Sequence, residues 1–280
     1  MSDTVLDNVE TWSGKGRGDE NFPVGSKLIA AKFRDPIHRY YTFARNADDV
    51  ADSPTLSPRD KLMRLGVMED VLLGRRSTGS PSALALRESL AKTGVTPKHA
   101  TDLLVAFRQD AVKSRYATID ELYSYCHYSA VPVGRYVLDL HGENHTCYSP
   151  SDALCTSLQI LNHIQDCVKD LKELDRCYLP QAVLDHFGAT VDDLRRPAET
   201  PAMRRVFVTL LDRVDRMNHA ASELPEIVRN RRLRIEIGII HGLSQRLARR
   251  LVYNDPISTR VKLRKSDAVI AILKSAYYLV

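Results

Sequence analysis

The chain has 280 residues, 44% of them hydrophobic, and its 40 lysines and arginines exceed its 35 aspartates and glutamates, giving a formal net charge of +5. This hydrophobic content is sufficient for a substantial core. The five cysteines form no Cys-x-x-Cys pair and the first residues lack a basic, apolar signal sequence, which favours a reduced, cytoplasmic protein over a secreted one.

The positive charge gathers in the last third of the chain, between residues 229 and 265. A solvated helix face explains such a cluster, and so does a surface that attracts anionic lipid headgroups. Nucleic-acid binding is disfavoured because no recognised nucleic-acid motif accompanies the charge. The apolar stretch 268–280 is interrupted by Lys274 and is shorter than the roughly 20 residues that span a bilayer. The protein is therefore expected to be either soluble in the cytoplasm or peripherally bound at the inner membrane.

Residues 1–20 are polar, and a flexible N-terminal tail is expected there. Apolar residues then recur at helical spacing over 26–52, with Pro36 inside the pattern, which indicates either one helix or two that meet near Asp35. Further helices are expected at 58–74, 82–93, 97–113, 118–141, 150–174, 181–187, 202–222, 224–252 and 265–278. No strand-like alternation is sustained. The sequence therefore predicts a single all-α domain over residues 21–280, a helical bundle around a central cavity.

Two pairs of aspartates carry the clearest chemical signal. Asp48 and Asp52 are four residues apart in the first expected helix, and Asp166 and Asp170 are four residues apart in the helix expected at 150–174. On an α-helix this spacing stacks both carboxylates of a pair on one face, one turn apart. Carboxylate oxygens suit Mg²⁺, which usually keeps positions for substrate phosphates. Two such faces turned toward each other predict a magnesium clamp for a diphosphate.

Neighbouring residues extend the predicted site. Asn162 lies one turn before Asp166 on the same face and offers a neutral oxygen ligand. Asp49 lies about 100° around the helix from Asp48, which indicates a hydrogen-bond partner rather than a ligand. One aspartate pair alone is common on solvated helices, but unpaired carboxylates are costly in helices that are otherwise apolar. Cationic side chains placed to neutralise diphosphate oxygens are Arg45, Lys169 and Arg260.

The segments around both pairs resemble those of squalene and phytoene synthases. Residues 40–52, with Arg45 three positions ahead of Asp48, are similar to the first aspartate motif of that family. Residues 158–170 and the following Arg176-Cys177-Tyr178-Leu179-Pro180 resemble the second motif and its tail. The resemblance covers roughly residues 22–265. It implies an isoprenoid-synthase fold, a prenyl diphosphate substrate, Mg²⁺ as cofactor, and diphosphate binding by Arg176.

Within the family, residues 20–26 and 129–135 are most similar to the bacterial hydroxysqualene synthases of hopanoid pathways. Other members usually carry Ala-Gly-x-Val-Gly where this chain has Ala130-Val131-Pro132-Val133-Gly134. Pro132 is expected to break a helical hydrogen bond and kink the segment 118–141 against the cavity. Glu236 replaces a tyrosine of the relatives and is expected to accept a proton from an attacking water. The residues expected to line the prenyl cavity, where tyrosines are also typical of core packing, are Phe22, Tyr41, Tyr125, Tyr128, Ala130, Pro132 and Gly134.

The resemblance implies a Mg²⁺-dependent carbon–oxygen lyase that ionises presqualene diphosphate, lets the carbocation rearrange, and captures it with water as hydroxysqualene. The nearest alternative is a head-to-head synthase that joins two farnesyl diphosphates to presqualene diphosphate or squalene, or a phytoene-type synthase. A catalytically silent lipid-binding or assembly subunit is disfavoured because the expected metal ligands are intact. The expected partner activities are a presqualene diphosphate synthase and a hydroxysqualene reductase.

Overall fold

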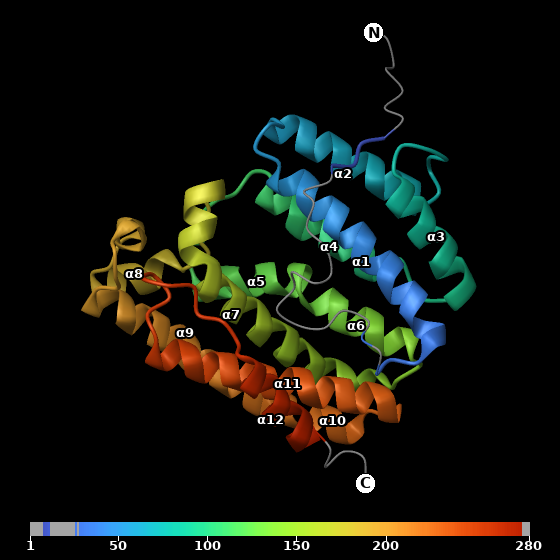
Figure 1. Cartoon of the computed structure of the whole chain (residues 1–280). Helices are drawn as coiled ribbons and strands as arrows, with labels where there is room; N and C mark the ends of the chain where they lie inside the picture. The colour runs from blue at the N-terminus through green and yellow to red at the C-terminus, as the bar shows by residue number, and fades with distance from the viewer. Residues whose placement is uncertain (1–7, 12–25, 27, 276–280) are drawn as a thin grey trace. The chain divides into compact units, whose positions relative to one another are not determined.

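A computed structural model describes residues 8–11, 26 and 28–275 of the chain. Helices dominate this described part, which contains isolated bridges but no extended strand, so the all-α prediction is confirmed (Figure 1). The chain divides into two compact units, one of Met1–Lys113 with Asp139–Gly142 and one of Ser114–Leu138 with Glu143–Val280. The single domain and the central cavity stay predictions. Within the described residues, no helix is both long and apolar enough to cross a membrane.

The first unit is built from the early helices. Ser57 and Ser80 begin two of them, because their side chains accept hydrogen bonds from backbone N–H groups of the first turn, directly before Pro58 and Pro81. The first helix continues through Pro36, which lies early enough to cost few backbone bonds, so the two-helix alternative is wrong. The four helices are α1 (Ala31–Asp52), α2 (Pro58–Leu72), α3 (Pro81–Thr93) and α4 (Lys98–Asp110).

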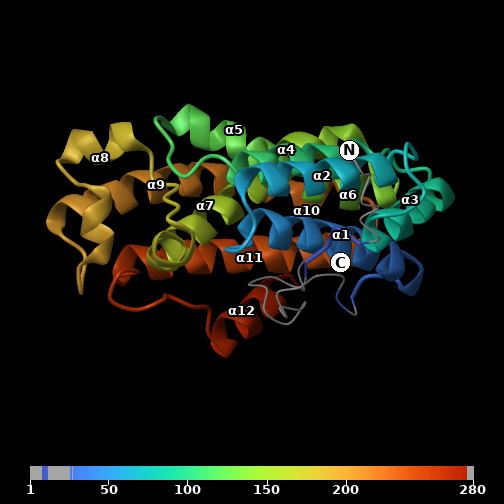
Figure 2. The ribbon, with the colours of Figure 1, turned by 90° about the horizontal axis from the view of Figure 1, so that it is seen from above.

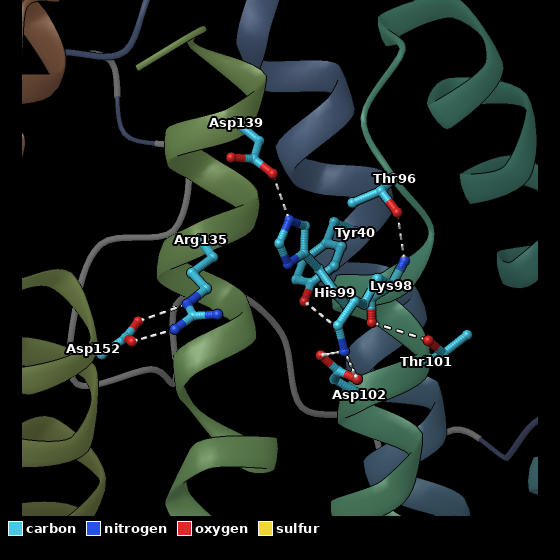
Figure 3. Close-up of polar contacts among 9 residues, drawn as sticks. All are labelled: Tyr40, Thr96, Lys98, His99, Thr101, Asp102, Arg135, Asp139 and Asp152. Atoms are coloured by element: carbon cyan, nitrogen blue, oxygen red, sulfur yellow. Dashed lines mark hydrogen bonds and ion pairs between the residues drawn. The ribbon is translucent and has the colours of Figure 1, made fainter. Parts of the chain in front are cut away.

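Polar contacts fix α4 in this unit. The Tyr40 hydroxyl on α1 donates to the backbone carbonyl of His99, and His99 Nε2 lies 2.7 Å from Asp139 Oδ2 (Figure 3). Near the N-terminus, Val9 is fully buried and the Glu10 carboxylate accepts a hydrogen bond from the Ser80 hydroxyl. This short segment is therefore packed rather than free. The other residues of the predicted tail, 1–7 and 12–20, lie outside the described part.

The second unit is organised around one long helix, α7 (Tyr148–Leu174), which packs against α9 and α11. At their shared core the Ser244 hydroxyl donates to Asn218 Oδ1 and lies 3.2 Å from the Ser157 hydroxyl, so polar groups of all three helices are satisfied. The other helices are α5 (Ile119–Ser129), α6 (Val131–Leu140), α8 (Gln181–Phe187), α9 (Pro201–Ala220), α10 (Leu224–Ile227), α11 (Arg231–Tyr253) and α12 (Lys265–Ser275). Short 3₁₀ turns occupy His145–Cys147, Val191–Arg195 and Ala221–Glu223.

The segment expected as one helix over 118–141 is two helices. Ala130, with φ −125° and ψ −45°, separates α5 from α6, and Pro132 lies in the first turn of α6, where its missing N–H costs no helical bond. The expectation that Pro132 breaks a hydrogen bond and kinks one long helix is therefore wrong, because the helix already ends at Ala130 and Pro132 belongs to the start of the next one. In the same way the expected helix 224–252 is divided, because Asn230 caps a new helix by accepting hydrogen bonds from the N–H groups of Arg232 and Leu233.

Helix α6 approaches α7 very closely at Gly134. A Cβ atom at this position would lie 2.5 Å from Ser151 Oγ and 2.6 Å from Cys155 Sγ. The adjacent Arg135 forms an ion pair with Asp152 of α7, with Nε 2.9 Å from Oδ1 (Figure 3). Because Gly134 has no side chain, α6 can lie directly against α7, and the Arg135–Asp152 ion pair stabilises this close packing of the two helices.

Candidate active site

The first aspartate pair lies at the C-terminal end of α1, close to the guanidinium of Arg45. The Arg45 guanidinium is 3.0 Å from Asp48 Oδ2 through Nη1 and 3.0 Å from Asp49 Oδ1 through Nη2. Asp49 is buried, whereas Asp48 and Asp52 are partly exposed. Asp49 therefore pairs with Arg45, as expected of a hydrogen-bond partner. Because α1 is continuous, Asp48 and Asp52 share one face and remain accessible to a ligand.

The electrostatics of this pair favour a cation. Desolvation and the neighbouring Asp52 carboxylate raise the pKa of Asp48 well above its usual value, and Arg45 offsets only part of this effect. Two carboxylates one turn apart repel each other when both are ionised. A bound cation would relieve that repulsion, so the donor chemistry of this face fits a divalent metal ion.

The second pair lies in the C-terminal half of α7. Arg260 donates two hydrogen bonds to the Asp166 carboxylate, from Nε to Oδ1 at 2.5 Å and from Nη2 to Oδ2 at 2.9 Å. The buried Gln165 side chain donates to the carbonyl of Val261 and so fastens the segment after α11 to α7. Asp170 and Asn162 are half-buried on the same face of α7 as Asp166. The guanidinium of Arg260 therefore lies at the face of α7 that carries the second aspartate pair, and it is the cationic partner of Asp166.

The other two predicted diphosphate-binding cations have different surroundings. Lys169 is exposed, and its ammonium lies 3.8 Å from Glu173 Oε2 one turn further along α7. Arg176 is buried and donates a hydrogen bond of 3.2 Å to the Tyr178 hydroxyl. Lys169 therefore lies at the surface beside Glu173, whereas Arg176 is held in the protein interior.

A buried aromatic cluster lies beside Arg176. The His163 ring stacks on Tyr178 with 3.6 Å between centroids, and Tyr125 and Tyr116 pack against Tyr178 at 5.1 and 5.2 Å. Burial, assisted by the charge of Arg176, lowers the pKa of His163 to about 3, so the imidazole is neutral at physiological pH. Sequence reasoning did not single out Tyr116, and it cited Tyr178 only within the motif tail. No local spacing signals the contact of Tyr178 with His163 or with Tyr116.

The remaining predicted residues are spread over four helices and the α5–α6 junction. Tyr41 on α1 and Tyr128 on α5 are half-buried, while Ala130 and Pro132 at the junction and Glu236 on α11 are buried. Tyr125 belongs to the aromatic cluster, and Gly134 faces Ser151 and Cys155 of α7. Phe22 lies outside the described residues.

The role of the aspartate pairs as metal ligands stays a prediction. Within the described residues, no three His, Cys, Asp or Glu side chains come close enough to hold an ion by themselves. Each pair by itself offers two carboxylates on one helix face. This donor set fits Mg²⁺, which binds through one or two carboxylates together with substrate phosphates rather than in an all-protein cage.

Comparisons with known proteins agree with the sequence motifs. Residues 15–267 match the family described as squalene/phytoene synthase. The chain is 45% identical over 262 residues to the hydroxysqualene synthase of Rhodopseudomonas palustris, covering 94% of this chain and 89% of that protein. It is 40% identical to the hydroxysqualene synthase of Zymomonas mobilis, covering 92% and 87% of the two chains. The crystal structure of squalene synthase HpnC from Alicyclobacillus acidocaldarius superimposes with a TM-score of 0.73 at 31% identity, covering 82% of this chain and 88% of that one.

Proposed function

Because this chain is an enzyme that belongs to the squalene/phytoene synthase family, we propose that it is a hydroxysqualene synthase, converting presqualene diphosphate into hydroxysqualene. The observation that carries the proposal is the similarity, at 45% and 40% identity over nearly the whole chain, to two proteins named hydroxysqualene synthase. Both aspartate pairs are intact, which supports a catalytic rather than a scaffolding role.

Asp48, Asp52, Asp166, Asp170 and Asn162 would hold Mg²⁺ together with the diphosphate of the substrate. The ion supplies positive charge that stabilises the departing diphosphate. On α1, Arg45 orients Asp48 and limits the repulsion between the carboxylates. On α7, Arg260 is already paired with Asp166, so it is held where an incoming diphosphate can exchange for the carboxylate as its partner.

Positive side chains complete the binding of the leaving group. Arg45, Lys169 and Arg260 neutralise the diphosphate oxygens, and the exposed Lys169 can move toward a bound anion. Arg176 is buried, so we propose that its charge acts from inside the aromatic cluster, where its hydrogen bond orients the Tyr178 hydroxyl. Breaking the carbon–oxygen bond sends the electron pair to the diphosphate and leaves a cyclopropylcarbinyl cation.

The proposed second stage is rearrangement and capture of that cation. Tyrosine rings present electron-rich faces to a cation, and Tyr125 and Tyr178 are fixed in the buried cluster for this role. Water adds to the rearranged carbon and loses one proton, for which we propose Glu236 on α11 as the acceptor. The products are hydroxysqualene and diphosphate, and no hydride donor is required.

The proposed reaction needs neighbours with defined chemistry. A prenyl synthase must supply the presqualene diphosphate, and a reductase must replace the hydroxyl group of the product with hydrogen. These two activities are the proposed partners of the chain in the pathway.

Product analysis tests the proposal directly. Pure protein with Mg²⁺ and no nicotinamide should convert presqualene diphosphate into hydroxysqualene, detected by mass spectrometry of the extracted C30 lipids. The same protein should not couple farnesyl diphosphate. Efficient formation of presqualene diphosphate or squalene from farnesyl diphosphate would instead establish the head-to-head synthase.

A further inference from the structure

Helix α12 has the reverse of the usual distribution of side chains. It lies beside α11 (Figure 2), yet the face turned to α11 carries the small or polar residues Asp267 and Ala271. The large aliphatic residues Val269, Ile272 and Leu273 are 54%, 53% and 68% exposed. A surface helix normally buries its aliphatic stripe against the core. These three residues are spaced at i, i+3 and i+4, so they form one continuous outer face, which we call the α12 aliphatic face.

The inner face of α12 is fixed by specific contacts, so the orientation of the helix is determined. The Asp267 carboxylate accepts hydrogen bonds from Arg250 Nε at 2.6 Å and from the backbone N–H of Arg264 at 2.7 Å. Ala271 fits against Gly242 of α11, where an added Cβ would lie 3.3 Å from the Ala271 Cβ. Rotating α12 to bury its aliphatic residues would break these contacts and bring large side chains against Gly242.

Positive charge frames the α12 aliphatic face. From residue 256 to the C-terminus, Asp267 is the sole acidic residue, and it is neutralised by Arg246 and Arg250. The exposed basic residues of the same stretch that are not bonded to Asp166 are Lys262, Arg264, Lys265 and Lys274. Lys265 begins α12 and Lys274 lies near its end, so cations are present at both ends of the aliphatic face.

We propose that the α12 aliphatic face binds the surface of an anionic lipid membrane. Val269, Ile272 and Leu273 enter the boundary between headgroups and acyl chains, while the flanking lysines contact the anionic headgroups. The combination of an aliphatic stripe and a basic border is the pattern of helices that lie in a membrane interface. A protein partner of neutral or basic surface would not use this border, and a second copy would bring two sets of like charges together.

Vesicle binding tests the proposal without any substrate. The full chain should co-sediment with phosphatidylcholine vesicles containing 30% phosphatidylglycerol and should be released by salt, since each basic residue near an anionic surface contributes roughly fivefold in affinity. The variant Val269→Ser/Ile272→Ser/Leu273→Ser should bind such vesicles about tenfold or more weakly. A matched control, Val112→Ser/Val208→Ser, removes exposed aliphatic residues elsewhere and should bind like the unaltered protein. Binding of the α12 variant equal to that of the control would overturn the proposal.

A fluorescent reporter gives a second readout that does not depend on loss of binding. The chain contains one tryptophan, Trp12, so Leu273→Trp in a Trp12→Phe background places the only indole on α12. Its emission should shift to the blue and be quenched by brominated acyl chains when anionic vesicles are added. An unshifted, unquenched emission would contradict insertion of this face.

Light scattering separates membrane binding from self-association. If the variant with three serines has a lower mass than the unaltered protein and binds vesicles equally well, the face is an interface between copies of the chain and the proposal fails.

This test is separate from that of the proposed reaction. The α12 residues lie outside the proposed catalytic set, so the serine variant should turn over detergent-dispersed presqualene diphosphate normally and lose activity on vesicle-borne substrate. Normal vesicle binding with no turnover of either form would refute the proposed function alone.

Discussion

Replacing Gly134 by alanine should destabilise the second unit. The added Cβ would lie 2.5 Å from Ser151 Oγ and 2.6 Å from Cys155 Sγ, well inside van der Waals contact. The Arg135–Asp152 ion pair holds α6 against α7 beside this point, so the helices are not free to separate. Overpacking of this kind typically costs about 1–3 kcal/mol. Alanine also favours the helix by about 0.5–1 kcal/mol, so we expect a net loss in the free energy of unfolding of about 1–2 kcal/mol.

Urea denaturation followed by circular dichroism measures this loss, and the chain offers a control. Gly66 lies inside α2 and has no atom within 4 Å of the position of an added Cβ. Gly66→Ala should therefore stabilise the protein by about 0.5–1 kcal/mol, because alanine is the better helix former. Opposite signs for the same chemical change would separate the close contact at Gly134 from the general effect of alanine on a helix.

A rescue experiment identifies the cause of the loss. Adding Ser151→Ala and Cys155→Ala removes the two colliding atoms, so the combined variant should lose much less stability than the sum of its separate changes. The sequence-based alternative, that Gly134 leaves room for a prenyl chain, predicts altered turnover with unchanged stability. A Gly134→Ala protein that unfolds at the unaltered urea concentration would refute the packing argument.

Other predictions concern the site and the last helix. Asp48→Asn and Asp166→Asn should keep the circular dichroism spectrum but lower turnover by about 10²–10³, because an amide is a poorer Mg²⁺ ligand of nearly the same shape. Near-normal turnover in either variant would contradict the clamp. Arg260→Gln should raise the KM for the diphosphate substrate, measured by steady-state kinetics, and an unchanged KM would remove Arg260 from the binding site. Desolvation opposes ionisation of Asp267, but bonds from Arg250 and Arg264 outweigh it and lower its pKa. Its ionised form therefore stabilises the fold above pH about 4. That contribution should fade as pH falls through the lowered pKa, so Asp267→Asn should be less stable than the unaltered protein at pH 7 and similar to it at the acid end of a denaturation series.

Local sequence patterns were sufficient for the positions of most helices and for the helix faces that carry the aspartates. Helical periodicity and capping residues such as Ser57 and Ser80 act within a few residues, so they can be read from a short window. Pro132 marked an irregularity in the segment 118–141, but the expected kink inside one helix is instead a boundary between α5 and α6. The break before α11 was missed, because Asn230 caps that helix without any proline or glycine to mark the boundary.

Contacts between distant segments could not be predicted in this way. Asp166 and Arg260 are 94 residues apart, and their pairing depends on how the segment after α11 lies along α7. The stack of His163 on Tyr178 likewise requires the chain to turn back after α7. Composition also concealed the orientation of α12, because the aliphatic residues that would normally identify the buried face of a helix are the exposed ones.

The origin of the product oxygen tests the central claim most directly. Pure protein, Mg²⁺ and presqualene diphosphate are incubated in water enriched in ¹⁸O, and the extracted alcohol is examined by mass spectrometry. Water capture of a carbocation predicts hydroxysqualene two mass units heavier, in proportion to the enrichment of the solvent. An unlabelled alcohol, or a C30 hydrocarbon in its place, would contradict the proposed reaction.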